Sequence, residues 1–503
     1  MQKAVFSLFL SSAMMLVLTG CSTIKNNHSQ KEPMMASYMA GDKVQAMAIL
    51  DKKLQEPSFF NSSVVNTGDE LAWRLEAGSL NFNYGNYQAC IDELKRAEQL
   101  IHDFDERALI SLRDLSSEAA TAVTNLNALP YRGFCRDRIA LSIFKSLAYL
   151  GNGNESAFRA QVNRLRNEQK RIKDEYEKFF EADKKQMDAT LSKHENVAKN
   201  VNANASPEAI AGNAQNQQFA ISWNEAKAIG NKGYGDFLNP AAIFLSGLGS
   251  VRDGNYDNAR IDFERLCKAM PNNPVFKQYY VTSLTKAGRE IPPEYQGVQP
   301  FDFPLDHDCV YVIVAHGRSA AFQQVAIYFP VMFAFPVCEY YPAPFNAVYA
   351  ETNGLTYQAV PLADMDAIHT QEFMTRLPGL LIRTITSTLI KEAASLVAYE
   401  AVHHSNMSFE HRLIAELFVL LGGMAYRAAM NTADTRSWEI LPKEFMLTQF
   451  PMPANRKVNI QLRGVSSQNI PVEIPAGSRS AILYINAPSV YNVVCQVLPI
   501  KSK

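Results

Sequence analysis

The sequence predicts an α+β protein in which an all-α half built of helical repeats precedes a mixed α+β domain. Before about residue 300, apolar residues recur with helical spacing, and one spacing pattern is repeated. Beyond that point, short runs of β-branched and aromatic residues lie beside proline and glycine, which is typical of strands. Apolar helical segments separate an earlier group of strands from a later one, and this order indicates an α+β domain.

The start of the chain has the features of an export signal. Lys3 is followed by a short apolar segment and by Leu18-Thr19-Gly20-Cys21, the pattern of a lipobox. We therefore expect residues 1–20 to be a signal peptide and Cys21 to carry the lipid, each buried CH₂ of which would contribute about 0.8 kcal/mol to membrane anchoring. Ser22 stands where an inner-membrane-retention signal would have Asp, so the outer membrane is favoured.

A repeated spacing, G-x4-A-x3-L, organises the helical half. It begins at Gly41, Gly85 and Gly254, with Cys90 in the second copy where alanine is usual. This is the spacing of the tetratricopeptide repeat, in which small residues let two helices approach and a large apolar residue fills the gap; the alternative is a set of unrelated amphipathic helix pairs. The residues expected to pack the repeat are Gly85, Tyr87, Leu94, Ala97, Gly247, Gly254, Tyr256, Ala259, Phe263 and Pro271.

The composition along the chain sets the expected boundaries. Residues 155–197 carry one apolar stripe and many charges, which predicts a long helix whose basic run Lys170-Arg171-Ile172-Lys173 belongs to a solvated face. A degenerate helix pair is expected at 138–166. The complete division is a lipidated tether (21–36), a helical repeat region with the long charged helix (37–197), a linker (198–217), a second tetratricopeptide-like region (218–290) and an α+β domain (300–500).

In the last of these regions we expect strands and two apolar helices. The helices cover about 377–402 and 408–430, and Arg383 and Glu416 interrupt them. Because neither reaches the ~20 clean apolar residues that a membrane span needs, core helices are predicted, with an interfacial membrane contact as the alternative. The expected strands are 309–314, 325–329, 331–335, 444–450, 457–463, 480–486 and 490–497.

Composition argues against some functions. The net charge is −1, with 47% hydrophobic and 20% charged residues. The chain therefore has no overall positive charge that would attract nucleic acid as a partner. Of seven cysteines, the six after Cys21 are sparse and irregularly spaced, and we expect most to be buried apolar residues. Cys309 and Cys338 form the one pair that merits a test as a disulfide.

No motif predicts a catalytic centre, a metal site or a cofactor. Asp306-His307-Asp308-Cys309 and His316 are metal-ligand types without the paired spacing of a zinc site, and a polar turn is expected there. His316-Gly317-Arg318-Ser319 has the residue types of a hydrolase loop but lacks a nucleophile elbow. His403-His404 and His411 are expected in a solvated turn.

The most distinctive local sequence is Ala433-Asp434-Thr435-Arg436-Ser437-Trp438 with Leu441-Pro442. Asp434 and Arg436 could pair or bind neighbouring backbone, and Trp438 could anchor a buried corner. With Arg376-Leu377-Pro378 and Asn239-Pro240, this segment resembles an uncharacterised family of bacterial tetratricopeptide-repeat lipoproteins that share a C-terminal A-D-T-R-S-W-x-x-L-P signature. The resemblance implies no activity.

The expected function is a protein-binding scaffold, anchored by lipid to the outer membrane and facing the periplasm. Its partner would be a periplasmic or outer-membrane protein gripped by the concave face of the repeats, in envelope assembly or in the regulation of peptidoglycan synthesis. The analogy with lipoprotein activators of peptidoglycan synthases is architectural. One alternative is an envelope hydrolase with a site in residues 300–500 that joins His316, Ser319 and a carboxylate. Another is a structural lipoprotein that acts on the membrane through the apolar helices.

Overall fold

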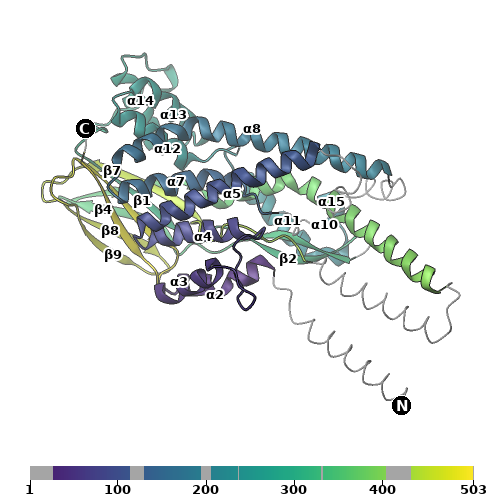
Figure 1. Ribbon diagram of the computed structural model, residues 1–503. Coiled ribbons are helices and arrows are strands. Elements are labelled where there is room, and N and C mark those ends of the chain that lie inside the picture. The colour runs from purple at the N-terminus through teal and green to yellow at the C-terminus, as the bar shows by residue number, and fades with distance from the viewer. Residues whose placement is uncertain are drawn as a thin grey trace.

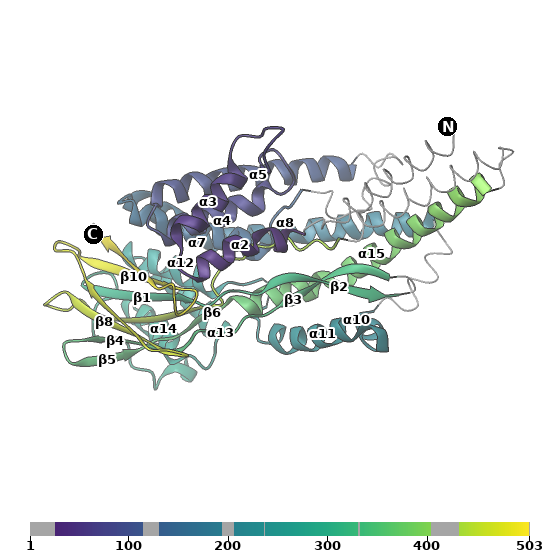
Figure 2. The same cartoon turned by 90° about the horizontal axis from the view of Figure 1, so that it is seen from below.

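The protein, described from a computed structural model, has three layers. The structure describes residues 26–113, 130–193, 206–235, 237–329, 332–403 and 432–501. Helices make up the first half and sheets lie in the C-terminal part, so the α+β prediction is confirmed. A layer of helices covers one face of a five-stranded sheet, and a four-stranded sheet covers the other face (Figures 1 and 2).

The helical layer is built from hairpins. Consecutive helices pack as α2 with α3, α4 with α5, α7 with α8, and α12 with α13, and α14 packs on α13. Their bounds are α2 Asn27–Met39, α3 Lys43–Leu54, α4 Glu70–Asn83, α5 Tyr87–Arg113, α7 Cys135–Gly151, α8 Glu155–Lys193, α12 Pro240–Arg252, α13 Tyr256–Ala269 and α14 Pro274–Lys286.

The four hairpin turns have one geometry. Each contains a glycine with φ between 70° and 79°, at Gly41, Gly85, Gly153 and Gly254. In each turn the N–H after the glycine donates to a carbonyl five residues back, as Asn86 does to Asn81 at 2.8 Å. This is a Schellman ending, and glycine adopts its left-handed conformation without a Cβ clash. The repeated glycine of the sequence pattern therefore sets how each hairpin turns.

The small residues allow the helices to cross closely, as the repeat spacing predicts. A Cβ on Gly78 would lie 2.2 Å from Leu94 Cδ2, and one on Gly247 would lie 2.7 Å from Phe263 Cε1. The ring of Tyr87 fills the space beside Gly151. Of the other expected packing residues, Ala97 and Ala259 are buried, Tyr256 is half-buried and Pro271 is exposed in the turn after α13.

The tether predicted for residues 21–36 is wrong from residue 27 onward, because α2 begins there. Asn26 caps the helix by accepting a hydrogen bond from Ser29 N at 2.9 Å. The segment looks solvated by composition, yet its polar residues Asn27, His28 and Lys31 are buried. At its other end, Tyr38 Oη donates to Asn486 Oδ1 at 3.1 Å, and Asn492 Nδ2 donates to the Tyr38 carbonyl at 2.6 Å.

The boundaries around the predicted linker also differ from the structure. Residues 206–216 form a short helix, a turn of 3₁₀ helix and their connection, and Pro207, Ile210 and Asn216 are buried. The next helix packs against α15 and the β2–β3 hairpin and is therefore not part of a second repeat. These elements are α10 Pro207–Ala211, η2 Ala214–Asn216 and α11 Gln217–Gly230, and a later 3₁₀ turn is η3 Pro293–Tyr295.

The five-stranded sheet has the order β11-β10-β1-β7-β6, with β1 parallel to β10 and the other neighbours antiparallel. The four-stranded sheet has the order β5-β4-β8-β9, and β2 and β3 form a separate hairpin. The strands are β1 Cys309–His316, β2 Ala321–Tyr328, β3 Met332–Glu339, β4 Phe345–Thr352, β5 Leu355–Gln358, β6 Val360–Asp364, β7 Glu444–Pro451, β8 Lys457–Gly464, β9 Gln468–Glu473, β10 Ser480–Ala487 and β11 Val494–Ile500.

All seven expected strand segments overlap strands of the structure, whereas β4, β5, β6 and β9 were not predicted. The central strand β1 is buried throughout. Alternate residues of β1 face opposite layers, because side chains alternate along a strand. Val310, Val312 and Val314 join the core between the two sheets, and Tyr311 and Ile313 join the core shared with the helices.

The helical half and the sheet share one core. A single buried apolar cluster runs from α2 to β11, and it includes Phe82 of α4 against Tyr484 of β10, with ring centroids 4.9 Å apart. The predicted division at residues 290–300 therefore does not separate two independent cores. The helix predicted at 377–402 lies within α15 (Met365–His403), whereas the one at 408–430 lies outside the described residues.

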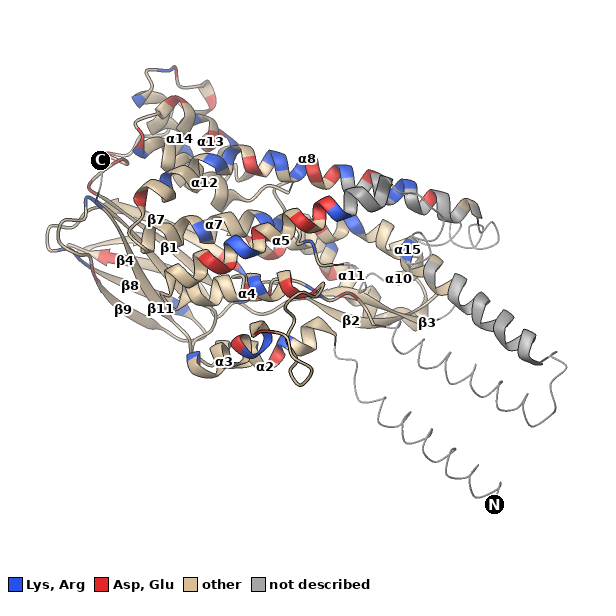
Figure 3. Cartoon of the chain, viewed as in Figure 1, with Lys and Arg blue, Asp and Glu red and all other residues tan. Residues whose placement is uncertain are grey.

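The long charged helix is confirmed as α8 as far as Lys193. Its apolar stripe is buried at Phe158, Val162 and Leu165, while Lys170 and Arg171 of the basic run are exposed. Lysine, arginine and acidic residues alternate along the outer surfaces of α5 and α8 (Figure 3). Arg171 pairs with Glu175 at 2.8 Å, so the run belongs to a solvated, charge-paired face.

We expect Gly78→Ala to lower the free energy of unfolding by about 1–3 kcal/mol, since the added methyl would overlap Leu94. Urea denaturation measures the change. The matched control is Gly379→Ala in α15, where the new Cβ meets nothing within 4 Å. This control should stabilise by up to about 1 kcal/mol through helix propensity. Equal changes in the free energy of unfolding for the two variants would contradict a close crossing of α4 and α5 that only a glycine at position 78 allows.

Candidate functional site

The signature segment, residues 432–443, lies between the helices and the sheet. It connects to β7 and contains no helix or strand, yet its residues from Thr435 to Leu441 are buried. Trp438 is fully buried; its Nε1–H donates to Ser79 Oγ at 3.0 Å, and its ring packs on Phe144 with centroids 5.6 Å apart. Such a segment has no ladder to satisfy its backbone, so its polar groups need partners from elsewhere.

Glu76 of α4 supplies those partners. Its carboxylate accepts hydrogen bonds from the backbone N–H groups of Glu439 at 2.8 Å and Ile440 at 3.0 Å. Lys31 of α2 donates to the same carboxylate at 2.8 Å and to the Ser437 carbonyl at 2.6 Å. The side chains of Lys31 and Glu76 are both fully buried. Burial raises the pKa of Glu76, and the Lys31 ammonium opposes that shift.

Asp434 and Arg436 form the ion pair that the sequence allowed, at 2.7 Å, and Asp434 also accepts from the Arg436 backbone N–H at 3.2 Å. Arg436 also reaches Asp69, at the start of α4, at 3.3 Å. With the buried indole of Trp438, this pair fixes the segment as a structural corner. The contact to Asp69 ties that corner to the helical layer.

Arg136 of α7 holds the segment from another side. Its guanidinium donates to the Trp438 carbonyl at 3.3 Å, to Ser319 Oγ at 3.1 Å and to Asp137 at 3.2 Å. Glu372 of α15 accepts from the first backbone N–H groups of α7, including Arg136 N at 3.1 Å. A carboxylate there complements the positive end of the α7 dipole. Burial raises the pKa of Glu372, against the effect of nearby Arg376.

A second cluster of charges lies around Glu439. His28 Nδ1 lies 3.1 Å and Arg318 Nη2 lies 2.5 Å from the Glu439 carboxylate, and His28 Nε2 lies 3.5 Å from Glu339. Glu339 and Glu32 are partly exposed, so the cluster reaches the surface. Burial disfavours the imidazolium, but the hydrogen bond and charge of Glu439 outweigh it and raise the pKa of His28. The pKa of Glu439 is lowered because His28, Lys31 and Arg318 outweigh its burial.

The residues of the hydrolase alternative are not joined by a hydrogen bond in the described structure. His316 lies at the end of β1, 3.3 Å from Glu444, and Ser319 Oγ accepts from Arg136. Both side chains are buried. A nucleophile needs an adjacent base and access for substrate, and a serine engaged by a buried guanidinium has neither. The geometry gives this alternative no support.

The polar residues near β1 and the cysteines do not form a metal centre. Within the described ranges, no group of three or more His, Cys, Asp or Glu side chains is arranged to hold an ion. His307 pairs with Asp306 at 3.1 Å, which suits a polar turn. Cys309 and Cys338, the pair that merited a test as a disulfide, are both free thiols in the structure, and burial raises the pKa of each to about 12. Most of the six cysteines are buried, as predicted.

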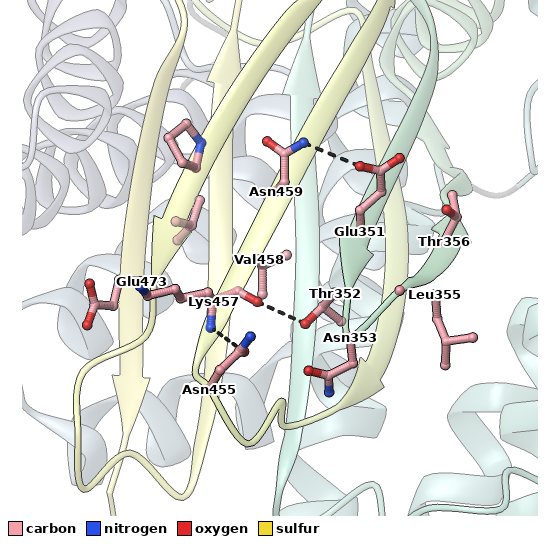
Figure 4. Close-up of a pocket in the computed structure, with 13 residues that line it drawn as sticks. Glu351, Thr352, Asn353, Leu355, Thr356, Asn455, Lys457, Val458, Asn459 and Glu473 are labelled. Carbon is pink, nitrogen blue, oxygen red and sulfur yellow. Dashed lines mark hydrogen bonds between the residues drawn. The ribbon is translucent and has the colours of Figure 1, made fainter.

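An open depression lies at the edge of the four-stranded sheet (Figure 4). Its polar groups are largely paired with one another. Asn459 donates to Glu351 at 3.4 Å, Thr352 donates to the Lys457 carbonyl at 2.8 Å, and Lys457 N donates to Asn455 at 3.0 Å. These are contacts between neighbouring strands and turns, and they define no reaction.

Several predicted features lie outside the described residues. They are Cys21, His404, His411 and the second apolar helix. Among the helices that the structure describes, none is both long enough and apolar enough to cross a bilayer. Comparison with protein-family models, with curated proteins and with solved structures found no match.

The sequence analysis missed the residues that surround the signature. These residues stand in helices, and their polar side chains resemble those of a solvated helix face. They are Lys31, Glu76, Arg136, Glu372 and His28. The available signal was the carboxylate of Glu76, which stands between Leu75 and Ala77 in α4. A charge among apolar residues is buried only when it is paired, and Lys31 supplies the pairing cation.

We expect Glu76→Gln to cost about 3–5 kcal/mol of unfolding free energy, because it leaves the Lys31 ammonium buried without a counter-charge. The double variant Lys31→Met/Glu76→Gln should recover part of this loss. Glu175→Gln is the matched control: it breaks an ion pair of the same 2.8 Å length on the exposed face of α8. That variant should cost under about 1 kcal/mol. Similar losses for the two single variants would contradict the buried clamp.

His28 should make stability depend on pH. A pKa raised in the folded state stabilises the protein below the unfolded value of about 6.5, and this stabilisation is lost as pH rises through the folded pKa. The facing groups are Glu32, Glu339, Glu439 and Arg318. The pKa of Glu439 is lowered, so its contribution to the free energy of unfolding is lost only in more acidic solution.

We therefore expect the unfolding free energy of the wild-type protein to fall, relative to His28→Asn, between about pH 6 and pH 8. Urea denaturation at both values measures the difference, and the variant cancels the contributions of the other histidines. Parallel pH profiles for the two proteins would show that His28 does not titrate with folding.

Proposed function

We propose that this protein is a lipid-anchored scaffold of the bacterial envelope that binds another protein through the outer surfaces of its helical hairpins. The hairpins are tetratricopeptide-like, and we infer membership of the lipoprotein family with the A-D-T-R-S-W-x-x-L-P signature. The identical glycine turns and the crossings at Gly78 and Gly247 support the repeat assignment. Acylation at Cys21 and the outer-membrane location rest on the lipobox sequence.

The proposal rests on one observation, which is the set of helix faces that remain exposed to solvent. In α4, α7 and α12 nearly every residue is buried. These inner helices pack toward the protein's own sheet, and the signature segment lies against α4 and α7. The concave face that the sequence analysis assigned to a partner is therefore filled by the chain itself. The exposed faces of α5 and α8, which extend past the four- and five-stranded sheets, form the longest part of the helical surface left for a partner, beside the shorter exposed faces of α3 and α13 (Figures 1 and 3).

The nature of these faces favours a protein partner. They carry both signs of charge, as with Lys170 beside the Arg171–Glu175 pair. Mixed charges suit an interface in which complementary groups set specificity and the rate of association. Their distribution gives no uniform positive field of the kind that nucleic acid requires. The stack also presents them from a rigid support, because each hairpin packs on its neighbour.

A photo-crosslinking residue at Lys170, tested in intact cells, should capture a defined envelope protein. The same residue at Thr356, exposed on β5 of the far sheet, is the matched control. We expect capture from α8 and not from β5, and loss of capture when Cys21→Ser releases the protein from the membrane. Capture of the same neighbours from both positions, or none from α8, would overturn the scaffold proposal. Retention of the Cys21→Ser protein in membranes would overturn the anchor.

A further inference from the structure

Two adjacent phenylalanines stand exposed at the tip of the loop between α3 and α4. Phe59 is 96% exposed and Phe60 is 95% exposed. Their rings touch each other edge to face, with centroids 5.3 Å apart. Two such rings present roughly 400 Å² of apolar surface, which is as large as the patches that mark interaction sites. The loop stands out from the helical layer in both views (Figures 1 and 2).

Hydrogen bonds hold the loop in this conformation. Ser58 N donates to Asn61 Oδ1 at 3.1 Å, and Asn61 Nδ2 donates to the Glu56 carbonyl at 2.7 Å. Ser63 Oγ donates to the Gln55 carbonyl at 2.7 Å. The turn is organised and its polar groups are satisfied close to the tip. The phenylalanines are therefore displayed by the local structure, and Glu56 is the one charged residue in segment 55–63.

The base of the loop is fastened to the start of α2. Val64 N donates to the Lys53 carbonyl at 2.9 Å and closes the loop. Lys53 Nζ donates to Gln30 Oε1, in the first turns of α2, at 3.1 Å. Phe60 is seven residues from Lys53, so the tip lies at most about 25 Å from this junction. The loop and the beginning of the described chain thus share one corner of the molecule.

The site of lipidation is close to the same corner. Asn26, which caps α2, follows Cys21 by five positions, a span of at most about 18 Å. With α2 formed from residue 27, an acyl chain on Cys21 holds this corner of the protein against the bilayer. The aromatic tip then lies within reach of the lipid headgroups. Exposed Lys52, at the end of α3, adds a positive charge that suits anionic phospholipid.

We propose that Phe59 and Phe60 insert into the membrane interface as a second, non-covalent contact beside the lipid anchor. Aromatic rings partition favourably into the interfacial region of a bilayer. Two contacts on one corner restrict how the body rotates about the lipid. They fix the direction in which the outer helices face. This inference rests on the proposed acylation of Cys21.

The test uses the acylated full-length mature protein on vesicles of phosphatidylethanolamine and phosphatidylglycerol. Phe60→Trp places an indole at the tip, and Leu355→Trp places one at an exposed site on β5, 59% exposed in the wild type. We expect a blue shift for Phe60→Trp and loss of its emission when the lipids carry bromine near their headgroups. Leu355→Trp should show neither, and wild-type emission from the buried tryptophans is subtracted.

The outcomes separate the loop from the anchor. Vesicle flotation without any change at position 60 would overturn the loop contact and leave the acyl anchor standing. An indole at position 60 that changes only when envelope extract is added would assign the loop to a protein partner and overturn lipid insertion. Failure to float would overturn the anchor, and the loop contact with it.

Discussion

The Glu76 carboxylate is the group on which the architecture most depends. Residues 432–443, which lead into β7, are largely buried and have no strand to pair with, so the N–H groups at 439 and 440 need an acceptor there. A carboxylate provides two strong acceptor atoms but brings a charge that must be neutralised, which Lys31 does. Helices α2 and α4 and the signature segment therefore depend on one another. Substituting Lys31 or Glu76 therefore leaves buried polar atoms of the other two elements without one of their hydrogen-bond partners.

This dependence explains why the repeats differ from an open array. Stacked helical hairpins ordinarily leave their inner helices free to bind an extended chain. In this protein the chain supplies its own occupant, with Trp438 against Phe144 and the backbone of 437–440 held by Lys31 and Glu76. The inner helix faces are thereby converted into core, and the proposed contacts with other molecules fall to the outer helices and the exposed loop. The most distinctive local sequence of the chain, Ala433 to Pro442, is in this case a packing element.

What the sequence predicted well is what neighbouring residues determine. The hairpin turns, the close crossings and strand β1 follow from glycine positions and from runs of β-branched residues. Strand β9 carries Pro471 and polar residues on the edge of a sheet, and β6 contains Pro361; both patterns weaken a strand prediction. The sequence predicts a tether in place of helix α2 because the polar residues there resemble a solvated segment. The buried partners of α2 are 406 positions away for Lys31 with Ser437 and 411 positions away for His28 with Glu439, separations that no local pattern reveals.

The attachment of α2 by Tyr38 to Asn486 and Asn492 has a consequence for the order of folding. The first described helix acquires its final partners from residues 448 and 454 positions further along the chain, and β1 waits for β10 in the same way. Contacts of such long range close large loops and slow the search for the native state. The polypeptide therefore leaves apolar strands such as β1 uncovered on one side until β10 has been made. Because the topology itself exposes those strands during this interval, folding would benefit from a chaperone that shields them.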